Sequence, residues 1–318
     1  MVGCGAVTER KSAPAYSQLE GSRLVAVASR RVDAARSYAS RHGLERVFET
    51  PDELIRSPVI DAVYIATPPS THLALARKVA EAGKPCSVEK PMAMSHAEAL
   101  EMVGAFEAAG QPLFVAYYRR SLPRFEQVRR WIGDGAIGAV RHAHWTLTRP
   151  PSAADLAGER NWRTDPREAP GGYFEDLACH GLDLFDFLLG PVVEAGGVSR
   201  TQQRLYEVPD AVAAAWAHEG GATGSGVWNF AAAGRSDRVE ITGSRGAISF
   251  AVFEEAPLRL ETNSGTEVLE ITNPDPIQLH HVEKMMQHLA GSAVHPSLGA
   301  SAARTEWVAD RILGRGGR

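Results

Sequence analysis

The chain has 318 residues, of which 44% are hydrophobic and 23% charged, with a formal net charge of −4. A chain this long is expected to form two domains, and its mildly acidic balance offers no general attraction to nucleic acid or to an anionic membrane. It has no run of 18 apolar residues and no signal-like start, and its three scattered cysteines suit a reducing cytosol, so we expect a cytoplasmic protein.

Residues 1–118 alternate between strand-like and helix-like segments. The strand-like runs are Leu24–Ser29, Ile60–Thr67, Cys86–Val88 and Pro112–Tyr117, and the helix-like segments are Val32–His42, Thr71–Ala82 and Ser95–Ala109. This rhythm is typical of a parallel sheet with helices on both faces. We therefore expect a Rossmann-type, doubly wound α/β domain that binds a dinucleotide.

Gly3-Cys4-Gly5-Ala6-Val7-Thr8 stands at the first strand-to-helix turn. Two glycines let the backbone bend tightly and approach a pyrophosphate at the start of a helix, so Gly3, Gly5, Ala6 and Val7 are candidate cofactor contacts. Thr8 replaces the third glycine of this fingerprint. Only Met1 and Val2 precede Gly3, where about five strand residues are usual, so we expect a truncated first strand with unpaired neighbours and a longer natural product.

Ser29-Arg30-Arg31 follows the second strand, at the place where an NAD-preferring site usually carries an acid. A hydroxyl and guanidinium groups can instead accept a 2′-phosphate through charge-assisted hydrogen bonds. We therefore expect NADP to be favoured over NAD. The alternative is that both arginines are solvated residues at the start of a helix.

Beyond Arg119-Arg120 the pattern changes, and residues 119–318 are expected to form an α+β domain with an open, largely antiparallel sheet for substrate binding and oligomerisation. A connecting helix is expected over Pro123–Ile132, a long loop from Pro150 to Pro170, and amphipathic helices over Gln278–Leu289 and Ala300–Leu313. The expected strands are Ala139–Thr148, Val192–Gln202, Asp210–His218, Thr223–Phe230, Arg238–Thr242, Ala247–Phe250 and Leu258–Glu261.

Four apolar residues are candidates for the outer face of this sheet: Trp145, Val212, Trp216 and Trp228. A broad apolar sheet face does not stay bare in water. These side chains therefore belong either to an ordinary core or to a subunit interface.

Three polar residues could work on one proton transfer. Lys90 follows a short strand, and Asp176 and His180 are four residues apart on an expected helix, about 40° from each other around its axis. A cation, an acid and an imidazole brought together could move a proton at an alcohol or carbonyl group. Taken singly, Lys90 could be an ordinary turn residue, and the Asp176–His180 pair a solvated helix face.

Glu89-Lys90-Pro91, the glycine-bearing turn and Asp176-x-x-x-His180 behind Gly171-Gly172 together resemble the Gfo/Idh/MocA oxidoreductase family, over nearly the whole chain. Tyr173 stands where the family often has a third glycine. The resemblance implies hydride transfer between a nicotinamide and a secondary alcohol or ketone of a sugar, inositol or related polyol. It also implies a dimer or tetramer formed by face-to-face pairing of the C-terminal sheets.

The resemblance further assigns site residues. Lys90, Asp176 and His180 would be catalytic, with Asp176 also binding substrate; Thr67, Pro68 and His72 would wall the nicotinamide side, and Glu89 and Lys90 would close that site. Trp162 and Arg163 would close over the substrate, although packing of their loop explains them equally well. Tyr118 directly follows the expected strand Pro112–Tyr117 and is a candidate substrate contact, because that strand ends at the crevice where such sheets bind ligands.

Two other functions stay open. A metal-dependent lyase or hydrolase could use Asp176, His180 and a third ligand such as His280 or His281, although no third ligand has a suitable spacing. A nucleotide-binding regulator without turnover could keep the same fold. For the leading interpretation we expect no metal.

Overall fold

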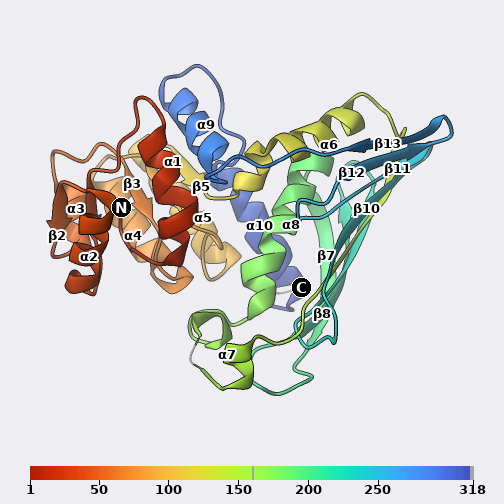
Figure 1. Ribbon diagram of the computed structural model, residues 1–318, viewed down its shortest axis with the longest axis horizontal. Coiled ribbons are helices and arrows are strands. Elements are labelled where there is room, and N and C mark those ends of the chain that lie inside the picture. Colours follow the sequence, from red (N-terminus) through yellow and green to blue (C-terminus); the bar gives the residue numbers. More distant parts are fainter. Residues whose placement is uncertain (160, 316–318) are drawn as a thin grey trace. The chain divides into compact units, whose positions relative to one another are not determined.

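A computed structural model describes residues 1–159 and 161–315 (Figure 1). The chain forms two compact units, the first made of Met1–Leu122 with Pro274–Ala303, and the second of Pro123–Asn273 with the residues from Arg304 onward. The chain first leaves the first unit close to the division predicted at residue 118. No sequence pattern indicated that Pro274–Ala303 returns to that unit.

The first unit contains short parallel strands of three residues each. Their order is β2-β1 in one sheet and β3-β4-β5 in another. The strands are β1 (Ala26–Ala28), β2 (Arg46–Phe48), β3 (Val63–Ile65), β4 (Cys86–Val88) and β5 (Leu113–Val115).

Met1 and Val2 join these two sheets by taking the central place between β1 and β3. The Val2 N–H donates to the Tyr64 carbonyl at 2.8 Å, and the Val2 carbonyl accepts from the Ala66 N–H at 2.8 Å. On the other side, the Met1 carbonyl accepts from the Ala28 N–H at 3.0 Å. Two residues thus make one twisted sheet out of two.

Helices of the first unit follow its strands, as the alternating sequence pattern predicts. Ser95 caps one of them by accepting a hydrogen bond from the Glu98 N–H at 3.3 Å, and Gly110 ends the same helix in the left-handed conformation. The helices are α1 (Ala13–Gln18), α2 (Val32–His42), α3 (Pro51–Arg56), α4 (His72–Glu81), α5 (His96–Ala109) and α9 (Leu279–Leu289), with shorter turns η1 (Thr8–Ser12), η2 (Pro69–Thr71) and η3 (Tyr118–Ser121).

The second unit is built on an eight-stranded sheet with the order β13-β12-β11-β10-β6-β9-β8-β7. All neighbours are antiparallel except β6 and β9, which confirms the predicted open, largely antiparallel sheet. The strands are β6 (Val140–Thr148), β7 (Val192–Arg200), β8 (Ala211–His218), β9 (Thr223–Asn229), β10 (Ser236–Gly243), β11 (Gly246–Phe250), β12 (Leu258–Thr262) and β13 (Gly265–Leu269).

Helix α8 (Tyr173–Leu189) packs on one face of this sheet (Figure 1). Its Phe174 ring meets Trp228 edge-on at 5.0 Å between centroids, and its Phe185 ring lies 5.5 Å from Trp216 and 6.4 Å from Trp145. The assignment of Trp145, Val212, Trp216 and Trp228 to the outer face is therefore wrong, since all four are at most 4% exposed in this core. Period-two alternation separates two faces but does not show which one a helix covers.

The remaining helices of the second unit are short or lie near its ends. They are α6 (Pro123–Gly133), α7 (Ala153–Leu156), the turn η4 (Trp162–Thr164) and α10 (Gly299–Ile312), whose first residues belong to the first unit. Helix α7 and η4 lie inside the stretch predicted as a loop. Among the described residues, no helix is long and apolar enough to cross a membrane.

Candidate active site

The turn after Met1-Val2 lies at the carboxyl edge of the first sheet. Gly3 has φ +95°, and a Cβ there would lie 2.5 Å from the Ala66 carbonyl oxygen, so only glycine fits. Gly5 and Ala6 are exposed, a Cβ on Gly5 would meet nothing within 4 Å, and helical residues begin at Ala6. Backbone this open at a helix start fits a pyrophosphate.

Thr8 has a structural role that accounts for its place in the fingerprint. It is fully buried, its hydroxyl donates to the Gly5 carbonyl at 2.8 Å, and its N–H donates to the same oxygen at 3.0 Å. Thr8 therefore holds the turn together on its buried side, and the accessible side of Gly5 and Val7 remains available to a ligand.

Ser29, Arg30 and Arg31 follow β1 at the same edge of the sheet. Arg30 and Arg31 are exposed, and the Ser29 hydroxyl accepts weakly from the Arg31 N–H at 3.4 Å. A hydroxyl and two exposed cations at a strand's carboxyl end can receive a phosphate.

His72 lies behind the site. It is fully buried, its Nε2 is 2.8 Å from the Thr67 carbonyl oxygen, and its Nδ1 is 3.0 Å from the Pro91 carbonyl oxygen. Burial lowers the pKa of this imidazole. His72 thus ties the loop after β3, which carries Thr67 and Pro68, to the loop after β4.

Glu89 is turned into the interior of the first unit. Its carboxylate, in a residue 6% exposed, accepts from the Tyr64 hydroxyl at 2.6 Å, the Gln278 side-chain amide at 3.2 Å and the Lys90 N–H at 3.2 Å. It holds the backbone at Lys90 rather than facing a ligand. Sequence reasoning missed Tyr64 and Gln278, and Gln278 is remote in sequence.

Lys90 is half-buried two residues after β4, and its charge acts on Tyr118. Burial alone would raise the pKa of Tyr118, but the charges of Arg119, Lys11 and Lys90 outweigh it and lower that pKa. The Arg119 guanidinium also lies 4.9 Å from the Tyr118 ring centroid. This part of the first unit is electropositive and stabilises negative charge on an oxygen.

In the second unit, Asp176 and His180 lie one turn apart on α8 and are 5% and 4% exposed. The Arg163 Nε donates to the Asp176 carboxylate at 2.6 Å, and the Arg163 guanidinium stacks on the Trp162 ring at 4.5 Å. The structure therefore brings Trp162, Arg163 and Asp176 together. A solvated helix face does not describe the Asp176–His180 pair.

Three residues beside this group had no sequence signal. The Phe253 ring lies 5.7 Å from the His180 ring and 5.1 Å from the Arg149 guanidinium. The Asp237 carboxylate holds this corner by accepting from the Phe253 N–H at 2.6 Å and the Trp145 indole at 3.0 Å. Burial lowers the pKa of Arg149, whose charge also interacts with Asp176.

Tyr173, the departure from the glycine pattern, braces the loop that carries Trp162 and Arg163. Its hydroxyl donates to the Asp155 carboxylate at 2.9 Å and accepts from the Asn161 amide at 2.9 Å. Burial and the Asp155 charge raise the pKa of Tyr173 to about 12.

Lys90 lies in the first unit, and Asp176 and His180 in the second. No group of three or more His, Cys, Asp or Glu among the described residues could hold a metal ion.

Both parts of the chain match known family models. Residues 1–117 match the oxidoreductase family with an NAD-binding Rossmann fold, and residues 125–249 match the GFO/IDH/MocA C-terminal domain. These matches agree with the parallel sheet of the first unit and the largely antiparallel sheet of the second.

Individual proteins show the same likeness. Oxidoreductase P35 of Formosa agariphila is 34% identical over 99% of this chain and 97% of its own length. Inositol 2-dehydrogenase of Rhizobium meliloti is 31% identical over 83% of this chain and 78% of its own length. A solved levoglucosan dehydrogenase in complex with NADH and levoglucosan superposes with a TM-score of 0.82 and 26% identity, over 92% of this chain and 87% of that one.

Proposed function

The chain belongs to the Gfo/Idh/MocA family of NAD-binding oxidoreductases, and we propose that it is an NADP-preferring dehydrogenase or reductase of a sugar, inositol or related polyol. The observation that supports this most is the Arg163–Asp176 pair beside His180, because it places a buried acid, a guanidinium and an imidazole on one rigid helix and its loop. Hydroxyl-rich substrates are recognised by such directional hydrogen-bonding groups.

A dinucleotide fits the first unit, and its nicotinamide when bound would accept or supply the hydride. Gly3, Gly5, Ala6 and Val7 would bind the pyrophosphate through the open backbone of their turn. Ser29, Arg30 and Arg31 would bind the adenosine ribose and its 2′-phosphate, which is the basis for proposing NADP rather than NAD. Thr67 and Pro68 would wall the nicotinamide side. His72 and Glu89 enter the proposal as supports of these loops, since their polar atoms already bind other parts of the first unit.

His180, Lys90 and Asp176 would divide the work at the substrate oxygen. His180 would take the hydroxyl proton during oxidation and return it during reduction, a step worth about 10²–10⁴ in rate. Lys90 would stabilise the developing alkoxide charge. Asp176, oriented by Arg163, would bind a neighbouring substrate hydroxyl and fix the position of the sugar ring. Trp162 would give that ring an apolar wall.

Single-turnover hydride transfer, monitored by nicotinamide absorbance with a panel of sugars and inositols, tests this function. Lys90→Ala and His180→Ala should each slow transfer by about 10²-fold or more, with dinucleotide affinity within several-fold of the parent. Because the two groups would act on one proton transfer, the double variant should lose far less than the product of the single losses. Undiminished transfer in a well-folded His180→Ala protein contradicts the mechanism.

We also propose that copies of the chain pair through the sheet face that α8 leaves uncovered. On this face the half-buried His142 and His144 both bind the Ser225 hydroxyl, at 3.0 and 2.8 Å, and Val227 beside them is 41% exposed. Light scattering should show a dimer or tetramer that Val227→Arg dissociates. Val294→Arg, at an exposed valine of the first unit, is the control and should leave the oligomer intact.

A further inference from the structure

Arg149 directly follows strand β6 and is a half-buried cation. Its backbone N–H donates to the Asn229 carbonyl at 2.8 Å, which fixes the residue where β6 and β9 end side by side. Its Nε is buried without a hydrogen-bond partner, and within residues 1–159 and 161–315 its guanidinium forms no ion pair. A guanidinium offers five donors, and a buried donor without an acceptor is costly. Arg149 is therefore able to take an acceptor from a ligand.

The Arg149 guanidinium lies beside the imidazole of the candidate active site, within the second unit. The Phe253 ring connects the two groups, since its centroid is 5.1 Å from the Arg149 Cζ and 5.7 Å from the His180 ring. Phe253 is itself fixed, because its N–H donates to the Asp237 carboxylate at 2.6 Å. An aromatic ring orients the flat side of a guanidinium and leaves the N–H groups at its edge available.

The carboxylates nearest to this guanidinium are bound to other donors. Asp176 accepts from the Arg163 Nε at 2.6 Å. Asp237 accepts from three successive backbone N–H groups at 3.2, 2.6 and 3.4 Å and from an indole at 3.0 Å. Each of these acids therefore has its own donors, and neither forms an ion pair with Arg149.

The surroundings of Arg149 add a second positive charge. Burial, and after it the charge of the exposed Arg235, lower the pKa of Arg149. Glu254 opposes this effect, but it is exposed and forms no ion pair with Arg149. This corner of the second unit therefore has positive charge available beside the residues that would bind the substrate, and an anion would be attracted there.

We propose that Arg149 binds a carboxylate of the substrate, and that the substrate is therefore an acidic sugar or polyol such as a uronic or aldonic acid. This inference rests on the proposed function and adds a charge to its substrate class. A single guanidinium matches a carboxylate in charge and, through two parallel N–H···O bonds, in planar geometry. Asp176 and His180 would then act on the hydroxyl groups of the same molecule.

Isothermal titration calorimetry on the full chain, saturated with whichever of NADP and NAD binds tighter, tests this selectivity. The titrants are matched pairs: D-glucuronate and D-glucose, D-galacturonate and D-galactose, D-gluconate and D-glucitol. At least one acid should bind ten-fold or more tightly than its neutral partner. Arg149→Gln should lower that ratio of affinities by about ten-fold or more, because a charge-assisted pair is lost.

Two further variants complete the design. Arg149→Lys keeps the charge without the planar fork, so it should recover only part of the ratio, and it also serves if the glutamine variant does not fold. Arg141→Gln changes an exposed arginine near the other end of β6 and is the matched control, which should keep the parent ratio. Melting temperatures show whether each variant is folded.

Three results would overturn the proposal. Equal affinities within every pair would show that no carboxylate is recognised. Equal weakening of an acid and its neutral partner by Arg149→Gln would show that Arg149 only supports the Phe253 ring. Tighter, Arg149-dependent binding of D-glucose 6-sulfate or 6-phosphate than of every carboxylate would assign the site to an ester instead.

Hydride transfer, measured separately, distinguishes this inference from the proposed function. Transfer from neutral sugars with selectivity unchanged in Arg149→Gln would refute the carboxylate site and leave the proposed function standing. Arg149-dependent binding of an acid without hydride transfer from any sugar or acid would refute the proposed function and support the carboxylate site.

Discussion

The Tyr64–Glu89 hydrogen bond is a direct test of how the first unit holds Lys90 in place. Tyr64→Phe removes a hydroxyl that donates to the buried Glu89 carboxylate at 2.6 Å and leaves the Gln278 and Lys90 contacts in place. A hydrogen bond to a charged group contributes about 1.5–3 kcal/mol. We therefore expect urea unfolding to show a loss of about 2 kcal/mol.

A double-mutant cycle isolates that bond. Glu89→Ala alone should also destabilise, because the acceptor that three donors share is lost. If the hydrogen bond is the shared cause, Tyr64→Phe combined with Glu89→Ala should lose about 1.5–3 kcal/mol less than the sum of the single variants. Additive losses within about 0.5 kcal/mol would refute the reasoning.

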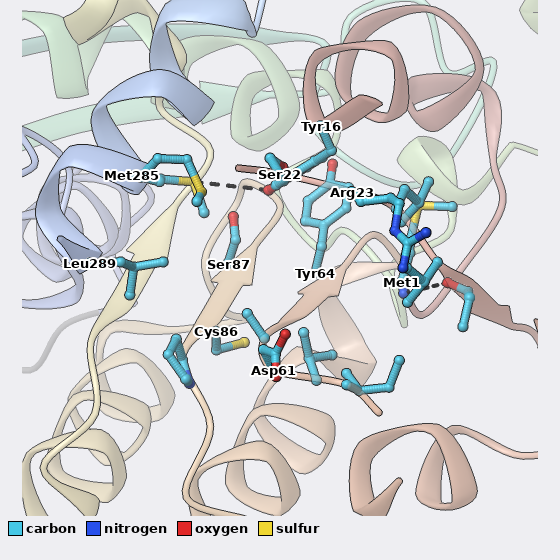
Figure 2. A pocket seen from close by; sticks show the side chains of 18 of the residues that line it. Met1, Tyr16, Ser22, Arg23, Asp61, Tyr64, Cys86, Ser87, Met285 and Leu289 are labelled. Carbon is cyan, nitrogen blue, oxygen red and sulfur yellow. Dashed lines mark hydrogen bonds between the residues drawn. The ribbon is translucent and has the colours of Figure 1, made fainter. Parts of the chain in front are cut away.

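Tyr16→Phe is the matched control for this cycle. The Tyr16 ring lies 5.3 Å from the Tyr64 ring, but its hydroxyl makes a sulfur contact with Met285 at 3.9 Å instead of binding a carboxylate (Figure 2). Its loss should cost well under the Tyr64→Phe value. Since the Glu89 carboxylate holds the Lys90 backbone, Tyr64→Phe should also lower single-turnover transfer while dinucleotide affinity changes little.

Three further predictions concern separate parts of the chain. Burial lowers the pKa of the Met1 amino group to about 5, so between pH 5 and 8 the unfolded chain binds a proton that the folded chain does not. The free energy of unfolding should therefore rise with pH across that window, by up to about 1.4 kcal/mol per pH unit. Urea unfolding at several pH values should show this rise, and the profile should be flatter for a chain with residues added before Met1. In thermal unfolding, Gly181→Ala should destabilise the protein by about 1–3 kcal/mol, because its Cβ would lie 2.2 Å from the Trp145 ring. Gly104→Ala is the control: its Cβ would meet nothing within 4 Å, and it should stabilise the protein by about 0.5–1 kcal/mol. Arg30→Ala should weaken NADP binding by about 10–150-fold in fluorescence titration with NAD affinity unchanged; equal losses for both dinucleotides would contradict a phosphate contact.

Strong periodic patterns predicted most of the fold. Helix α2 (Val32–His42) and strand β4 (Cys86–Val88) have the predicted bounds, because apolar spacing and flanking turn residues agree there. Strands β2 and β13 were missed: β2 has three residues, none of them fully buried, and four of the five β13 residues are exposed. Short or edge strands leave little apolar pattern to detect.

The site was partly predictable for a related reason. Motifs that are contiguous in sequence identified Lys90, Asp176 and His180 as candidates, but the groups that orient them come from distant segments. Gln278 reaches Glu89 across 189 residues, and Asp237 reaches Trp145 across 92. Neither residue stands in a recognisable local pattern, so only the folded chain shows these contacts.

The return of Pro274–Ala303 to the first unit has a consequence for synthesis. Helix α9 and Ser297, which bonds to Val115, are translated only after all eight strands of the second unit's sheet. At about 5–20 residues per second, the first unit therefore lacks its last segment for several seconds while the sheet of the second unit is translated. The second unit's sheet can therefore assemble first, although it is encoded later, and a fragment ending at Leu122 would lack helix α9 and the Ser297–Val115 hydrogen bonds of the first unit.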